Sequence, residues 1–135
     1  MRTAWARLKW FAANAPDVYD RTRTVCGIAD WIALELTGEL LMEETLAVES
    51  GLGLLASGEP ARALAPAFNI GDIQLPATCP PGTVAGTLKK KFSDPLGLHK
   101  NTPVVTCGPD AQSRLVGLGA QLPNVIGINS GWTTF

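Results

Sequence analysis

Residues that build metal centres or disulfide frameworks are scarce in this sequence. It contains a single histidine, His99, and three cysteines (Cys26, Cys79 and Cys107) that stand far apart without a Cys-x-x-Cys pair. Structural zinc sites and disulfide frameworks need such residues in closely spaced sets. The composition therefore argues against both, fits cysteines that stay reduced, and leaves His99 as a surface-loop residue. We expect no metal site in this chain.

The sequence also contains few charged residues and lacks long apolar runs. Charged residues make up 17% of the chain, the net charge is −1, and the basic residues cluster only at 89–91, a lysine run that suggests a solvated face. No apolar run reaches the ~18 residues of a membrane span, and the first residues lack the apolar core of a signal peptide. We expect a cytoplasmic protein that partners neither nucleic acid nor a membrane.

What the chain does have is apolar content and helical periodicity. At 135 residues and 46% hydrophobic content it fits one globular domain. Residues 3–14 predict a helix with Ala4, Leu8 and Phe11 on one face, followed by a short turn from Pro16 through residue 20. Residues 25–36 predict a second amphipathic helix, with Ile28, Ile32 and Leu36 on its apolar face and a glycine stop at residues 37–38.

The second half of the chain reads as short strands mixed with helices. Residues 60–68 predict a short helix, residues 75–82 an extended connector, and residues 82–88 a strand. Residues 104–106 predict a buried strand, 111–120 a helix rich in small residues, and 125–128 a last strand. This order is typical of an α/β fold. Because the last strand ends in a Gly/Thr turn with nothing to pack on it, we expect further chain downstream.

Three groups of carboxylates are candidates for chemistry. Asp30 lies near a helix start, where a carboxylate suits the helix dipole. Glu43, Glu44 and Glu49 match no metal-ligand spacing and suggest a solvated face. Asp110 follows the strand at 104–106, at the edge of the sheet where ligands bind in open α/β folds. It is a candidate catalytic base, and equally a candidate N-cap of the next helix.

Several segments, in order, resemble the FGGY family of carbohydrate kinases. The match runs over almost the whole chain, and its Asp-x-Gln form and its closing residues 130–135 are most similar to the autoinducer-2-kinase and pentulose/gluconate-kinase side of the family. The segments are Leu8-Lys-Trp10 with Asn14-x-Pro16, Ala29-Asp-Trp-Ile32 with Leu36-Thr-Gly-Glu39, Gly82 to Leu88, Gly97-Leu98, Thr102 to Val105, Gly108-x-Asp110-x-Gln112, and Gly117-x-Gly119-Ala120.

The resemblance implies part of an actin-like (ribonuclease H-like) ATPase domain, the second half of the family's N-terminal domain. Within 1–135 it implies a helical substrate-side segment (1–56), a connector with a short strand (57–101), and a strand-helix-strand unit with the catalytic aspartate (102–135). Asp110 matches the general base for a sugar or polyol hydroxyl, and Gln112 is a substrate-binding candidate. Gly131 and Thr133 stand at the family's second phosphate contact, with the threonine displaced by one position.

The chain lacks the family's Asp-x-Gly-Thr phosphate hairpin and the adenosine-binding domain. ATP and Mg²⁺ are therefore expected for the complete enzyme, and this chain alone is expected to be an inactive kinase fragment. Two alternatives stay open. One is a kinase-derived module that binds a sugar or another protein without catalysis, with self-association through uncovered apolar faces. The other is an unrelated α/β domain in which Asp110 only caps a helix.

Overall fold

Two separate two-stranded sheets organise the described part of the chain, with helices around them. The computed structural model describes residues 3–130. In chain order the elements are α1 (Ala4–Asn14), α2 (Pro16–Arg21), α3 (Ile28–Thr37), β1 (Leu41–Glu43), α4 (Glu44–Ser50), the 3₁₀ turns η1 (Arg62–Leu64) and η2 (Pro66–Phe68), β2 (Ala77–Cys79), β3 (Val84–Thr87), α5 (Lys90–Leu96), β4 (Pro103–Val105) and α6 (Asp110–Gly117).

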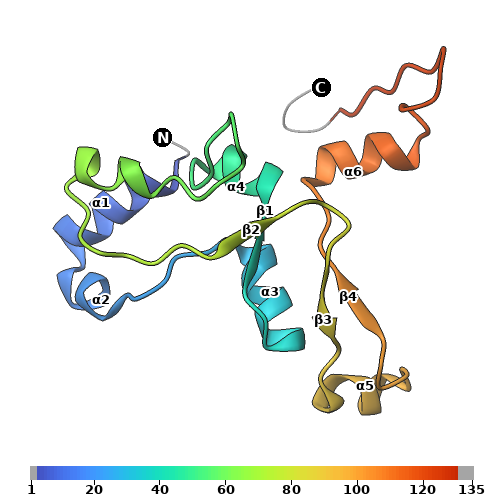
Figure 1. Cartoon of the computed structure of the whole chain (residues 1–135), viewed down its shortest axis with the longest axis horizontal. Helices are drawn as coiled ribbons and strands as arrows, with labels where there is room; N and C mark the ends of the chain where they lie inside the picture. Colours follow the sequence, from blue (N-terminus) through green and yellow to red (C-terminus); the bar gives the residue numbers. More distant parts are fainter. Residues whose placement is uncertain (1–2, 131–135) are drawn as a thin grey trace.

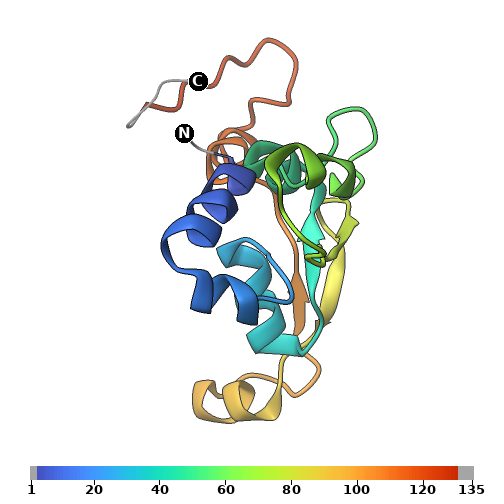
Figure 2. The same ribbon diagram turned by 90° about the vertical axis from the view of Figure 1, so that its left-hand side faces the viewer.

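The two sheets differ in direction and in how they are connected. β1 and β2 pair in parallel, so the chain between them, residues 44–76, crosses over through α4 and the 3₁₀ turns. β3 and β4 form an antiparallel pair with an irregularity between Val84 and Gly86. In Figure 1 this second pair stands beside the first, with α5 below it and α6 above it. Figure 2 shows the helices α1, α2 and α3 (blue) to one side of the strands.

The hydrophobic core lies in the first 75 residues. Trp5 and Leu8 of α1 pack with Met42 of β1 and with Leu52 of the loop after α4. The Trp5 indole N–H donates to the carbonyl of Gly51 at 2.7 Å, so the ring's polar group is satisfied where the ring is buried. The rest of the cluster comes from α4 and the connector: Ala47, Ala61, Ile70 and Leu75.

The helices α1 and α2 and the end of α3 confirm the sequence expectations, but the buried face of α3 does not. Gly38 ends α3 with φ +96°, the left-handed conformation that glycine adopts readily. Ile28 and Ile32 are 79% and 47% exposed, whereas Asp30 and Ala33 are buried. The expected apolar face is therefore wrong for Ile28 and Ile32, whereas Leu36 is half-buried. The helix α3 buries Asp30 and Ala33 and leaves an exposed apolar stripe.

The second half confirms the expected strands at 82–88 and 104–106 and the helix after Asp110. β4 is not buried as expected, since Val105 is 49% exposed. The strand expected at 125–128 is not formed, because no described strand lies beside it to share backbone hydrogen bonds, and Ile126 is 89% exposed. The segment expected as one helix over 60–68 is η1 and η2, two 3₁₀ turns.

The lysine run is not simply a solvated face. Lys90 and Lys91 open α5, and Lys89 lies just before it. The Lys89 ammonium donates at 3.0 Å to the carbonyls of Leu34 and Glu35, and its backbone N–H donates to Leu36. A cation at these carbonyls complements the negative end of the α3 dipole. Lys89 thus ties β3 and α5 to the end of α3.

Across residues 3–130, none of the helices has the length and apolar character that crossing a membrane would require.

Candidate functional site

Asp110 stands at the junction of β4 and α6, fully at the surface. It is the first residue of α6, and its carboxylate is 78% exposed. The N-cap position belongs to Pro109, and no side chain caps this helix. The carboxylate instead lies 3.0 Å from the guanidinium of Arg114, one turn further along α6. The capping interpretation is therefore wrong, and the carboxylate is free to face a ligand on its open side.

A hollow of about 320 Å³ lies beside the loop that carries Asp110. Gln112 lines this hollow from α6, Gly108 and Pro109 line it from the loop, and Thr45 lines it from the first turn of α4. The structure places Gln112 two residues after Asp110, about 200° further round α6. Gln112 lines the open space, and Asp110 does not. Gly131 and Thr133 lie outside the described residues.

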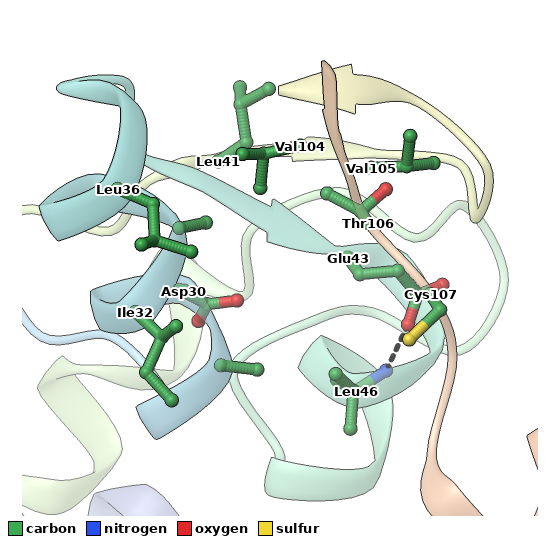
Figure 3. Close-up of a pocket in the computed structure, with 12 residues that line it drawn as sticks. Asp30, Ile32, Leu36, Leu41, Glu43, Leu46, Val104, Val105, Thr106 and Cys107 are labelled. Atoms are coloured by element: carbon green, nitrogen blue, oxygen red, sulfur yellow. Dashed lines mark hydrogen bonds between the residues drawn. The ribbon is translucent and has the colours of Figure 1, made fainter. Parts of the chain in front are cut away.

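A second hollow, of about 300 Å³, lies between α3, β1 and β4 (Figure 3). Its walls are mostly apolar, with Ile32 and Leu36 from α3 and Val104 from β4. Asp30 and Glu43 are the two carboxylates in its lining, and both side chains are nearly fully buried. This hollow holds two acidic groups that the sequence assigned to helix ends or to solvent.

Glu43 is buried and fully engaged, so its expected place on a solvated face is wrong. Its exposed fraction is 2%. Its carboxylate accepts hydrogen bonds from the backbone N–H groups of Thr45 and Leu46, both at 3.0 Å, and from the Thr45 hydroxyl at 2.6 Å. Figure 3 shows the bond to Leu46. Glu43 is the N-cap of α4, and the missed signal was a carboxylate between a short strand and a helix, two residues before a threonine.

Asp30 lies in the first turn of α3, as expected from the sequence, but it is buried as well. Its carboxylate accepts a hydrogen bond from the Gly27 backbone N–H at 2.7 Å. Burial raises the pKa of Asp30, the backbone N–H groups of Gly27 and Glu43 oppose this rise, and the nearby Glu43 carboxylate adds to it. Asp30 therefore closes the first turn of α3 beside the Glu43 carboxylate at the end of β1.

The three cysteines are free thiols in different surroundings. Cys79 is buried, Cys26 is half-buried and Cys107 is exposed. Burial, with a smaller contribution from the Asp30 charge, raises the pKa of Cys26. His99 is exposed in the loop after α5, as expected. Within residues 3–130 there is no group of three or more His, Cys, Asp or Glu side chains that could hold a metal ion.

Comparison with known proteins identifies the family. The model of the N-terminal domain of the FGGY family of carbohydrate kinases matches residues 1–117. The chain belongs to the FGGY family of carbohydrate kinases. The resemblance read from the sequence segments is thereby confirmed, and so is the α/β fold class as part of the family's actin-like N-terminal domain.

The most similar relatives include autoinducer-2 kinases. That of Salmonella paratyphi B is 34% identical over 121 residues, covering 90% of this chain and 23% of the relative. That of Enterobacter sp. is 35% identical over 117 residues, covering 87% of this chain and 22% of the relative. This agrees with the side of the FGGY family that the Asp-x-Gln segment indicated.

Solved structures of FGGY kinases share the fold. Xylulose kinase from Rhodospirillum rubrum superposes with a TM-score of 0.79 at 29% identity, covering 90% of this chain and 25% of that one. Gluconate kinase from Lactobacillus acidophilus gives a TM-score of 0.78 at 24% identity, covering 87% of this chain and 24% of that one. The chain thus spans about a quarter of the length of the FGGY kinases that it matches.

Proposed function

We propose that this chain is the acceptor-side segment of an FGGY kinase that phosphorylates a sugar or polyol, with Asp110 as the general base. The carboxylate of Asp110 takes the proton of the acceptor hydroxyl, and that oxygen forms a bond to the γ-phosphorus of ATP. The bond from the γ-phosphorus to the bridging oxygen breaks, and ADP leaves. A carboxylate suits this role because its work is to orient the hydroxyl and receive its proton.

The observation that carries this proposal is the position of Asp110. Its carboxylate is exposed at the first turn of α6, which follows the carboxyl end of β4 after the four residues 106–109. Its only charged contact among the described residues is Arg114, one helical turn away, which leaves the remaining oxygen lone pairs open to a hydroxyl. Gln112 lines the adjoining hollow and is proposed to bind acceptor hydroxyls.

The nucleotide is proposed to be bound by the complete enzyme and not by this chain alone. The described residues contain no cluster of side chains that fits a metal ion, so no Mg²⁺ ligand is assigned here. Gly131 and Thr133 are proposed as phosphate contacts on the family pattern alone. We expect the isolated chain to produce no ADP when MgATP is supplied with xylulose, gluconate or glycerol. Turnover that Asp110→Asn abolishes would contradict this expectation of inactivity.

The role of Asp110 is tested in a chimera. Residues 1–117 replace the matching segment of the 35% identical autoinducer-2 kinase, and kcat is measured for Asp110→Asn and for Asp94→Asn. Asp94 is the matched control, because it is also exposed and paired to a residue on its own helix, Lys90, at 3.9 Å. We expect Asp110→Asn to lower kcat by about 10²-fold or more and Asp94→Asn to leave it unchanged. Equal activity of the two variants would contradict the proposal.

A second candidate function is a non-catalytic interaction module. It is favoured by the outward apolar stripe of α3, where Ile28 is 79%, Trp31 53% and Ile32 47% exposed. Such a module would self-associate or bind a partner through this stripe. Size-exclusion chromatography with light scattering, together with calorimetric titration of sugars, tests it. A monomer at ~100 µM that binds no sugar contradicts the module.

A further inference from the structure

We propose that Glu43 and Thr45 are positioning residues for Asp110. They form a seat in which the Glu43 carboxylate holds the Thr45 hydroxyl, and this hydroxyl lies against Gly108 in the loop that leads from β4 into α6. This inference rests on the proposed role of Asp110 as the general base. Neither seat residue contacts Asp110 directly, so their effect passes through the loop.

The lower part of the seat is rigid because Glu43 is buried and its hydrogen bonds converge. Two backbone N–H groups of the first turn of α4 donate to its carboxylate at 3.0 Å. The Thr45 hydroxyl donates to the same carboxylate at 2.6 Å, a short bond of the charge-assisted kind. The hydroxyl is therefore held in one orientation, although Thr45 itself is exposed.

The upper part of the seat is the contact between Thr45 and Gly108. A Cβ atom added to Gly108 would lie 3.3 Å from the Thr45 hydroxyl oxygen, closer than an ordinary side-chain contact. Gly108 is not among the residues with positive φ, so its backbone conformation does not require glycine. A side chain at residue 108 would need the Thr45 hydroxyl to move by a few tenths of an ångström. The loop therefore lies close against α4 at this residue.

From Gly108 the connection to Asp110 is short and itself hydrogen-bonded. The Ser113 hydroxyl donates to the Gly108 carbonyl at 3.2 Å, and the Ser113 backbone N–H donates to the Pro109 carbonyl at 3.0 Å. The loop and the first turn of α6 thus form one unit. A shift of Gly108 on Thr45 moves the helix start, and with it the Asp110 carboxylate. In catalysis, a displacement of about 1 Å in a reacting group can lower the rate by up to 10²-fold.

Thr45→Val is the first test, because valine keeps the shape of threonine and removes the hydroxyl. Thr45→Ser keeps the hydroxyl and is the conservative rescue, and Thr87→Val, at an exposed position of β3, is the control. In the 135-residue chain we measure ¹⁵N order parameters of Gly108 and Asp110. We expect values near ~0.85 in the wild type, Thr45→Ser and Thr87→Val, and a fall toward ~0.6 in Thr45→Val. If the order parameters of Gly108 and Asp110 are unchanged in a folded Thr45→Val variant, the proposal that Thr45 positions the loop is contradicted.

A double-mutant cycle gives a second and independent readout. Gly108→Ala introduces the Cβ that meets the Thr45 hydroxyl, so its effect should be smaller when Thr45→Ala has already removed that oxygen. If the two substitutions have additive effects on the order parameter of Asp110, the proposed contact between Thr45 and Gly108 is contradicted. A purely structural contribution of each residue to folding would give such additivity.

Kinetics in the chimera separate this inference from the proposed function. We expect Thr45→Val to lower kcat about 10-fold with little change in KM, since the acceptor still binds while the base is misplaced. If Asp110→Asn lowers kcat but Thr45→Val behaves like Thr87→Val, the positioning role fails and the base remains. If Asp110→Asn leaves kcat unchanged, the proposed role of Asp110 as the general base is contradicted, and the positioning role that rests on it is contradicted as well.

Discussion

Replacing Glu43 with alanine is the sharpest test of how this segment is held together. The substitution removes three hydrogen bonds that its carboxylate accepts, two from backbone N–H groups and one from the hydroxyl of Thr45. At a net value of about 1 kcal/mol each, their loss should lower the free energy of unfolding by about 3 kcal/mol. Relief of the repulsion between the Glu43 and Asp30 carboxylates works in the opposite direction, but these backbone donors lose their only side-chain acceptor.

Urea unfolding followed by tryptophan fluorescence measures this loss. Trp5 is 2% exposed and reports on the core, whereas Trp10 and Trp31 are already more than half exposed, so we expect them to contribute a smaller change. Glu49→Ala is the matched control, because Glu49 lies on the same helix, is exposed and accepts no hydrogen bond among those described. We expect it to change stability by less than ~0.5 kcal/mol. A loss below about 1 kcal/mol for Glu43→Ala would refute the view that Glu43 anchors α4.

Two further predictions concern titratable groups. The pKa of Asp30 is raised in the folded chain, so as pH rises its carboxyl loses the proton first in the unfolded chain. The free energy of unfolding therefore falls as pH rises from about 4 through the raised pKa. The fall is at most about 1.4 kcal/mol for each pH unit. Unfolding in urea at several pH values should show this loss in the wild type and in the exposed control Asp72→Asn, but not in Asp30→Asn. Mass spectrometry after brief alkylation should find Cys107 modified at least ~10-fold faster than Cys26. The reason is that Cys107 is exposed, whereas burial raises the pKa of the Cys26 thiol. Equal rates of modification would contradict this prediction.

The elements that could be predicted from the sequence are those with strong local signals. The proline at residue 16 and the glycine at 38 set the ends of the helices, and the short β-branched run at 104–106 marked β4. Burial was harder to predict, because it depends on what packs against each face. Ile28 and Ile32 have the periodicity of a core face, yet Ile28 is 79% exposed, and Ile32, 47% exposed, faces only the open hollow beside β1 and β4.

In the candidate site, too, features with a local sequence signal could be predicted and features that depend on packing could not. The position of Asp110 at the end of a strand was readable from the order of strand, turn and acid. The buried carboxylate of Glu43 was not, because glutamate is seldom buried and only the approach of α3 and β4 encloses it. Thr45 and Gly108 are more than sixty positions apart in the sequence, so no local sequence pattern could predict their contact.

The arrangement of the two sheets has a consequence for the order in which the chain folds. The strands β3 and β4 are antiparallel and joined by α5 and a short loop, so their pairing closes only a small segment. The strands β1 and β2 are parallel, and residues 44–76 must be ordered between them before they can meet. Since longer loops take longer to close, we expect the β3–β4 pair to form early and the β1–β2 pair to limit the folding rate. The β3–β4 pair would then form before α4, against which the loop to Asp110 lies, is in place.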